Sequence, residues 1–224
     1  SLMKDARGIK GTYYIASLIE EGEHERQDFK FAVPDARKIA HSLSAFANHS
    51  GGRLLIGVKD NGAIAGVRND EDIYMVEMAA EIHCVPPQKV RITPFRVDGG
   101  LVVVRAEIDP SPVRPVEVRE ADGKLKAYYR VADENIAASP LMVKAWRRAS
   151  DPARESMVRL DDAGRALLTL ASRDGGADIE EVMLAAHLSR QGAEELAVSL
   201  YAMELVEFAY IGGRFKLTCP PVGS

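Results

Sequence analysis

The sequence SAFANHSGGRLLIGVKDNGAIAG, residues 44–66, contains five glycines around one short apolar run. Gly51 and Gly52 follow a helical pattern and predict its end, because glycine adopts the left-handed conformation of a helix C-cap at little cost. The next segment, RLLIGV at residues 53–58, is apolar on both faces, which is typical of a central, buried strand. Asn61 and Gly62 then predict a tight turn. The stretch therefore predicts a helix, a buried strand and a turn in succession.

The segments on either side of this stretch alternate between helical and strand-like patterns. Upstream, a helix is expected over residues 13–21, a strand over residues 28–33 and a helix over residues 35–48. In the strand, Asp28 and Lys30 fall on one face and Phe29 and Phe31 on the other. Downstream the patterns predict a helix at residues 69–85, hairpins pairing 89–97 with 101–108 and 115–120 with 124–131, and a helix at residues 139–148. This mixture predicts an α+β fold.

The C-terminal part has a different pattern. Helices are expected over residues 163–172 and 179–187, and a third follows the N-cap candidate Ser189 and continues to about Glu207. Two short strands around Gly212 and Gly213 come next. The order helix, helix, helix, hairpin predicts a small winged helix-turn-helix domain. The predicted organisation is a first domain at residues 1–149, a linker at 150–157 and the winged-helix domain at 158–224.

Composition limits the class of protein. Of the 224 residues 46% are hydrophobic and 28% charged, and no apolar run approaches the roughly 20 residues that span a membrane, so a soluble protein is expected. Cys84 and Cys219 have no metal-ligand or disulfide-framework spacing, which favours a cytoplasmic location. The whole net charge of −4 lies from Val158 onward, where ten acidic residues stand against six basic ones. A nucleic-acid partner is therefore expected to meet the N-terminal part.

The glycines do not form a nucleotide-binding motif. Gly57 and Gly62 have the spacing of a phosphate-binding loop, but Ala63 and Ile64 occupy the positions of its lysine and hydroxyl residue. A dinucleotide-binding G-x-G-x-x-G is also absent from the sequence. The glycines are therefore interpreted as turns.

Four segments taken together resemble a known family. DFK, AFANHSGG, LLIGVKDNGAIAGV and a later YYRV are similar to the Schlafen AlbA-like domain, a nucleic-acid-binding domain of bacterial regulators and of Schlafen proteins. The similarity covers roughly residues 23–148. It implies a mixed sheet with flanking helices, and in bacterial relatives a winged helix often follows. The implied function is a DNA-binding transcriptional regulator, with DNA favoured over RNA as the partner.

The resemblance also implies a chemistry. Nucleolytic Schlafens cleave RNA with an acidic trio, and the corresponding residues here resemble Glu23, Asp28 and Asp60. Such oxygen ligands suit Mg²⁺ or Mn²⁺, so the trio is both the candidate catalytic and the candidate metal set. Asp28 is shorter than the family's glutamate and Lys59 replaces a common acidic residue. The alternative is a solvated acidic loop.

The second hairpin carries the strongest binding pattern. Lys124, Lys126, Tyr128 and Arg130 alternate along one strand face, where they could hold phosphates and stack on a base. The alternative is cross-strand ion pairing with glutamates of the same hairpin, Glu117 and Glu120. The candidate nucleic-acid-binding residues of the first domain are Lys30, Asn48, Arg53, Lys59, Lys124, Lys126, Tyr128 and Arg130.

The winged-helix domain has fewer candidates. Arg190 begins the third helix and Arg214 lies at the wing, two places that contact DNA in winged helices. Glu194 and Glu195 follow one turn later and would repel phosphate, so dimerisation through this acidic domain is the competing hypothesis. The leading prediction is a nucleic-acid-binding regulator. The alternatives are a metal-dependent ribonuclease and a nucleotide-binding or dimerising interaction protein.

Overall fold

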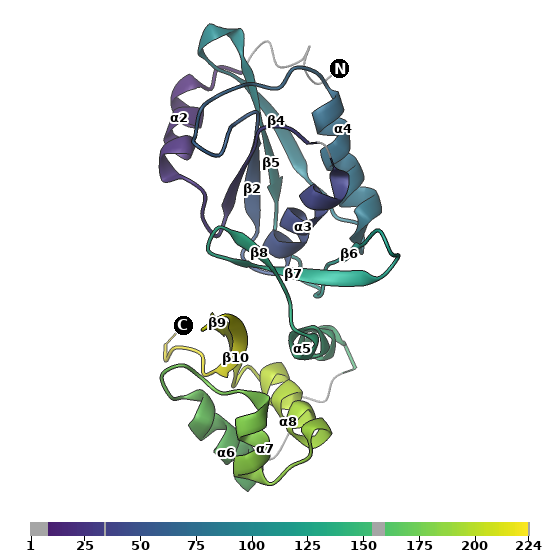
Figure 1. Ribbon diagram of the computed structural model, residues 1–224, viewed down its shortest axis with the longest axis vertical. Coiled ribbons are helices and arrows are strands. Elements are labelled where there is room, and N and C mark those ends of the chain that lie inside the picture. Colours follow the sequence, from purple (N-terminus) through teal and green to yellow (C-terminus); the bar gives the residue numbers. More distant parts are fainter. Residues whose placement is uncertain (1–8, 34, 154–159, 224) are drawn as a thin grey trace. The chain divides into compact units, whose positions relative to one another are not determined.

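The computed structural model describes residues 9–33, 35–153 and 160–223. The chain divides into two compact units (Figure 1): unit 1 is Ser1–Pro112 with Val116–Ala137, and unit 2 is Val113–Pro115 with Ala138–Ser224. The division falls before the helix that was expected at residues 139–148, which groups with unit 2. Part of the segment expected as a linker, residues 154–157, lies outside the described residues.

A four-stranded mixed sheet forms the centre of unit 1. Its order is β1-β2-β5-β4, in which β1 and β2 are parallel and the other pairs are antiparallel. The expected central position of the residue 53–58 run is confirmed, because β2 has a hydrogen-bonded neighbour on each side. The strands are β1 (Gln27–Lys30), β2 (Gly52–Ile56), β4 (Arg91–Arg96) and β5 (Val102–Ile108).

Helices cover both faces of this sheet. Figure 1 shows α2 (Thr12–Glu21) on one side and α3 (Ala36–Ala47) with α4 (Glu71–Met78) on the other. Leu54 and Ile56 of β2 join the core under α3, whereas Leu55 joins the core under α2. Successive residues of a strand point to opposite faces, so a strand buried on both faces must be apolar at every position. This explains why the run from Leu54 to Ile56 is apolar on both faces.

A second four-stranded sheet in unit 1 was only partly expected. Its order is β3-β6-β7-β8, all antiparallel, and the β6–β7 hairpin confirms the second predicted hairpin. The helix expected over residues 69–85 is shorter than predicted, because α4 continues as a π-helical turn η2 (Ala79–His83) and Cys84 then pairs with Val118. The strands are β3 (Cys84–Val85), β6 (Glu117–Arg119), β7 (Leu125–Val131) and β8 (Glu134–Ala137).

Unit 2 is helical with one hairpin. Its elements are α5 (Pro140–Ser150), α6 (Asp162–Ala171), α7 (Ile179–Ala186), α8 (Arg190–Ala202), β9 (Glu207–Ile211) and β10 (Arg214–Thr218). The Ser189 hydroxyl accepts a hydrogen bond from the Gly192 amide, which confirms the expected N-cap of α8. The helix expected to reach Glu207 ends at Ala202, and Glu204 in the following turn has φ of 61°. Leu167, Leu200 and Leu217 contribute to a core separate from those of unit 1.

Candidate nucleic-acid interface and acidic pair

Gly51 and Gly52 are each required to be glycine, but for different physical reasons. Gly51 has φ of 73°, the left-handed conformation expected for the end of a helix. Gly52 does not share that conformation and is instead the first residue of β2. A Cβ at Gly52 would lie 2.5 Å from Cδ1 of Phe46, so glycine is needed there because α3 approaches the strand closely. The prediction that both glycines cap the helix is therefore wrong for Gly52.

Asn48 was expected to contact nucleic acid, but it is fully buried. Its amide nitrogen donates to the carbonyl oxygens of Val116 and Tyr128, both at 2.9 Å, and its oxygen accepts from the Val116 amide at 2.7 Å. The Asn48 side chain thus joins the end of α3 to β7 and to Val116, the residue before β6. Its role in this structure is structural, because its amide group is engaged within the protein.

Arg130 was expected on an exposed strand face and is instead 1% exposed. Its guanidinium donates to the Gln27 carbonyl at 3.1 Å and to the Asn135 side-chain oxygen at 2.8 Å. The guanidinium carbon also lies 4.9 Å from the centre of the Phe46 ring. The prediction that Arg130 contacts phosphate is wrong for this structure, because the residue joins β7 to β1 inside unit 1.

Tyr128 is also buried, at 9% exposure, so its ring is not free to stack on a base. Its hydroxyl donates to Glu120 Oε1 at 2.7 Å, and its ring stacks on His41 at 4.3 Å. The same Glu120 oxygen lies 2.9 Å from His41 Nε2. Burial and the hydrogen bond to Glu120 raise the pKa of the Tyr128 phenol. Glu120 therefore interacts with both Tyr128 and His41.

Lys124 and Lys126 remain exposed, as expected, at the turn end of the β6–β7 hairpin. Among the described residues no carboxylate lies within ion-pair distance of either ammonium, and the Lys126 Nζ lies 5.8 Å from the Tyr128 ring centre. Arg119, in the paired strand β6 opposite Leu125, is a third exposed cation that the sequence reasoning did not select. In this pairing Arg119 shares a face of the hairpin with Leu125, so it lies near the turn but on the face opposite to Lys124 and Lys126. These three cations are called the hairpin cations below.

The remaining candidate cations of the first domain, Lys30, Arg53 and Lys59, differ in their contacts. Lys30 forms an ion pair with Asp28 at 3.1 Å. Arg53 donates to Gln27 Oε1 at 2.7 Å and pairs with Glu21. Lys59 is exposed and lies over the Phe31 ring, 5.2 Å from its centre. Lys59 is therefore the only one of these three cations that no carboxylate of the described residues pairs with.

The acidic trio is partly assembled. The carboxyl groups of Glu23 and Asp28 are hydrogen-bonded to each other, and the Phe29 amide donates to Glu23 Oε1 at 3.1 Å. Burial and the Asp28 carboxylate raise the pKa of Glu23 from 4.5 to about 7, with a smaller contribution from the charge of Asp60. The pKa of Asp28 is lowered by the Glu23 hydrogen bond and by Lys30, against the opposing effect of burial. Glu23 and Asp28 therefore share a proton near neutral pH.

This arrangement does not fit a divalent metal ion. The described residues contain no group of three histidine, cysteine, aspartate or glutamate side chains placed to hold one. The Lys30 ammonium and the Arg130 guanidinium, 3.1 and 3.9 Å from Asp28 Oδ2, already balance the charge of this carboxylate. A metal ion would have to displace both the shared proton and the Lys30 contact, since it needs ionised, accessible oxygens.

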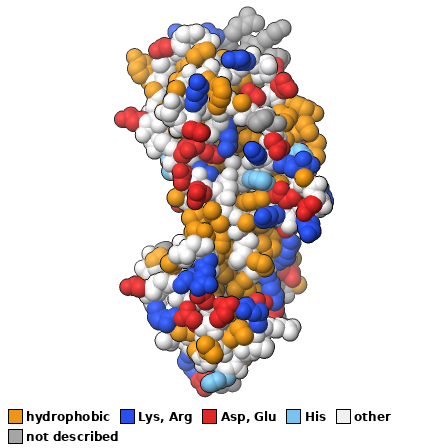
Figure 2. Space-filling view, viewed as in Figure 1, with side chains coloured by type: hydrophobic (Ala, Val, Ile, Leu, Met, Phe, Trp, Pro, Cys, Tyr) orange, Lys and Arg blue, Asp and Glu red, His pale blue; other side chains and the backbone are white. Residues whose placement is uncertain are grey.

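The two candidate cations of unit 2 are engaged within that unit. Arg190 pairs with Glu180 at 2.7 Å and lies 4.0 Å from Glu194, and Arg214 pairs with Asp178 at 2.9 Å. Figure 2 shows acidic and basic side chains next to one another on the visible face of this unit rather than a patch of one sign. A phosphate at either arginine would have to compete with a carboxylate.

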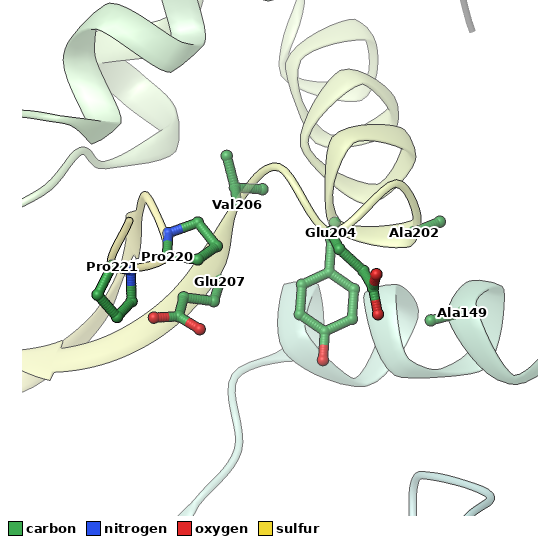
Figure 3. Close-up of a pocket in the computed structure, with 8 residues that line it drawn as sticks. Ala149, Ala202, Glu204, Val206, Glu207, Pro220 and Pro221 are labelled. Atoms are coloured by element: carbon green, nitrogen blue, oxygen red, sulfur yellow. The ribbon is translucent and has the colours of Figure 1, made fainter. Parts of the chain in front are cut away.

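Unit 2 also contains a cavity of about 560 Å³ at the end of α8. Figure 3 shows Glu204 and Glu207 with Pro220 and Pro221 among the side chains that line it, together with Val206. Two carboxylates and an apolar wall do not suit an anionic ligand. The cavity is therefore unsuited to a phosphate backbone.

Residues 23–139 match the family described as Schlafen, AlbA_2. The chain belongs to this family. Membership supports a nucleic-acid-binding role, and the matched residues include the acidic pair, Asn48, the hairpin cations and Arg130. This family assignment confirms the resemblance found in the sequence, and the α+β architecture of unit 1 agrees with it.

The other comparisons add little about function. The DIP2311 protein of Corynebacterium diphtheriae is similar at 22% sequence identity and a TM-score of 0.45, over 79% of this chain and 32% of that one. The chain thus spans about a third of the length of that solved protein. No curated protein matches. In the part of the chain that the structure describes, none of the helices has the length and apolar character needed to cross a membrane.

Proposed function

We propose that the protein is a nucleic-acid-binding regulator that holds DNA through the hairpin cations Arg119, Lys124 and Lys126. The observation that supports this proposal most directly is that all three are exposed on one hairpin and that no carboxylate of the described residues pairs with them. Phosphate binding depends on such cations, because each one that meets the backbone releases condensed counterions. Binding through them is expected to depend strongly on salt and little on sequence.

Fluorescence anisotropy of labelled duplex DNA, single-stranded DNA and structured RNA tests this proposal. The double variant Lys124→Glu/Lys126→Glu is expected to lose binding to the preferred nucleic acid. The matched control Lys10→Glu/Lys89→Glu changes the charge equally at two exposed lysines elsewhere in unit 1 and is expected to keep most of it. Equal losses of affinity in the two variants would show that only the net charge of the protein matters, which would contradict the proposed interface. Preference for duplex DNA favours a transcriptional regulator over an RNA-binding protein.

For unit 2 we propose a winged-helix module that contacts protein, a second copy of the chain included, rather than DNA. The engagement of Arg190 and Arg214 by Glu180 and Asp178 supports this assignment. Light scattering on the full chain, with and without DNA, tests it. A monomer under both conditions, together with weaker DNA binding in Arg190→Ala, would instead indicate DNA contact by α8.

Ribonuclease activity is the second candidate function, and the hydrogen-bonded Glu23–Asp28 pair is the observation that favours it. A carboxyl group with a pKa near 7 is suited to proton transfer at neutral pH. Cleavage of a structured RNA by the parent but not by Glu23→Gln would support this activity. Binding without cleavage favours the regulator.

A further inference from the structure

Phe31 departs from the strand pattern in a way that exposes an aromatic ring. The alternation predicts that it shares the buried face of Phe29, but β1 ends at Lys30 and Phe31 is 48% exposed. It lines a cleft of about 240 Å³ with Ala32, Gly66, Arg68, Asn69, Glu71 and Asp72. This large apolar ring lies outside the core clusters of unit 1 and is accessible to a partner at the edge of the cleft.

The cleft lies where parallel strands end. β1 and β2 are parallel and finish at Lys30 and Ile56, and the Gly57 amide donates to the Lys30 carbonyl at 2.7 Å. In open sheets, ligands bind beyond the carboxyl ends of parallel strands because the following loops diverge there. The loop that carries Gly66 is held against this edge, since a Cβ on Gly57 would meet the Gly66 backbone at 2.8 Å. The backbones of Gly57 and Gly66 therefore pack closely together beside the cleft.

Charged side chains of both signs line the cleft, because Arg68 lies there together with Glu71 and Asp72. Glu71 and Asp72 line it and offer carboxylate acceptors, and the Asn69 side-chain oxygen accepts from the Glu71 amide at 3.0 Å. Lys59 contacts the Phe31 ring but does not line the cleft itself. The two carboxylates accept hydrogen bonds from the amino group of a base, as aspartate and glutamate do with cytosine, and the Arg68 guanidinium offers a donor beside them. The Lys59 ammonium beside the ring suits the phosphate of the same nucleotide.

We propose that this cleft binds one unpaired nucleobase with an exocyclic amino group, which lies against the Phe31 ring while its phosphate meets Lys59. The inference rests on the proposed nucleic-acid-binding function and adds to it a subsite for an unstacked base. Stacking on an aromatic ring tolerates any base, because every base has a π-face. The carboxylates of Glu71 and Asp72 add the preference for adenine, cytosine or guanine over thymine.

A single-stranded DNA that contains 2-aminopurine tests the subsite directly, since its fluorescence falls when the base stacks. Saturating parent protein is expected to quench the probe, and Phe31→Ala is expected to abolish quenching and to weaken affinity about ten-fold. Phe31→Tyr keeps the ring and is expected to retain both properties. Tyr13→Ala removes a different exposed ring, 92% exposed on α2, and serves as the matched control. Binding by anisotropy with equal quenching in the parent and Phe31→Ala overturns the subsite but leaves the proposed function intact.

Mononucleotides make the test independent of the hairpin. Deoxycytidine and deoxyadenosine monophosphates are expected to shift the backbone amide resonances of Gly66 and Asn69 more than thymidine monophosphate does. Lys124→Glu/Lys126→Glu is expected to lose affinity for long strands yet to keep these shifts. If neither the parent nor Lys124→Glu/Lys126→Glu binds long strands, while both keep the nucleotide shifts, the proposed function is overturned but the subsite is not. Absence of shifts in the parent, or equal shifts with all three nucleotides, would overturn the subsite.

Discussion

The Asn48 side chain and the Val116 backbone exchange two hydrogen bonds, at 2.9 and 2.7 Å, in the way that two paired strands would. Together with the bond from Asn48 to the Tyr128 carbonyl, this contact attaches the second sheet to the end of α3. The amide of asparagine is the shortest side chain with both a donor and an acceptor in one plane. An asparagine expected at the binding surface therefore serves to connect two parts of the fold.

The first prediction concerns this contact. Asn48→Ala is expected to lower the free energy of unfolding by about 2–4 kcal/mol, because it removes four buried hydrogen bonds and leaves the Val116 amide without a partner. Urea unfolding of the full chain, monitored by fluorescence, measures the effect. Asn61→Ala, at an exposed turn, is the control and should cost less than about 1 kcal/mol. Equal losses in the two variants would contradict the structural role.

A second prediction concerns pH. The pKa of Glu23 rises from 4.5 to about 7 on folding, so the folded state binds a proton more tightly than the unfolded state does. The stability from this group is therefore complete below about pH 4.5 and is lost as the pH rises to about 7. Glu23→Gln supplies a neutral donor at every pH and is expected to raise the melting temperature at pH 8 while changing it little at pH 5. Parallel pH profiles for parent and variant would show that Glu23 titrates normally.

A third prediction concerns the hairpin cations. Each of Arg119→Ala, Lys124→Ala and Lys126→Ala is expected to flatten the slope of log affinity against log salt by up to about one unit, since each cation releases about one counterion. Arg130→Ala is expected to act differently and to lower the melting temperature, because Arg130 is buried and bonded to Gln27. Anisotropy titrations at several salt concentrations measure the slopes. Unchanged slopes in folded variants would remove the hairpin from the interface.

The fourth prediction concerns Gly52. Gly52→Ala is expected to destabilise the protein by about 1–3 kcal/mol, because the new methyl group would meet the Phe46 ring at 2.5 Å. Phe46→Leu in the same chain is expected to relieve part of that clash, so the two losses should not add. Chemical unfolding of both single variants and the double variant measures the coupling. Full additivity would show that the ring does not cause the requirement for glycine.

The fifth prediction separates binding from metal-dependent cleavage. Millimolar Mn²⁺ is expected to leave the melting temperature unchanged, because Lys30 and the shared proton occupy the places that a cation would take at Asp28. A transfer RNA incubated with the protein and Mn²⁺ is expected to stay intact. A rise in melting temperature that Asp60→Asn abolishes would instead assign the trio as a metal site and favour the ribonuclease.

Much of unit 1 follows from local sequence. The run Leu54–Leu55–Ile56, bounded by glycines, predicts a strand buried on both faces, and the structure places it between β1 and β5 with residues in two cores. The hairpin turn at Gly123, with φ of 82°, likewise follows from residue type. The family resemblance depends on these same local features, so it could be recognised from the sequence alone.

The sequence could not determine which polar side chains face water, and most of the errors arise there. Alternation along β7 correctly grouped Lys126, Tyr128 and Arg130 on one face, but α3 and β1 cover the last two and leave only the first exposed. Pairing between distant segments also created β3, since Cys84 becomes a strand only because Val118 lies beside it. Local periodicity thus determined the elements, whereas burial, ion pairing and the shared proton of Glu23 depend on contacts between residues far apart in the chain. The tertiary structure alone decides these, because a charge or an amide is stabilised by whatever partner the fold brings to it.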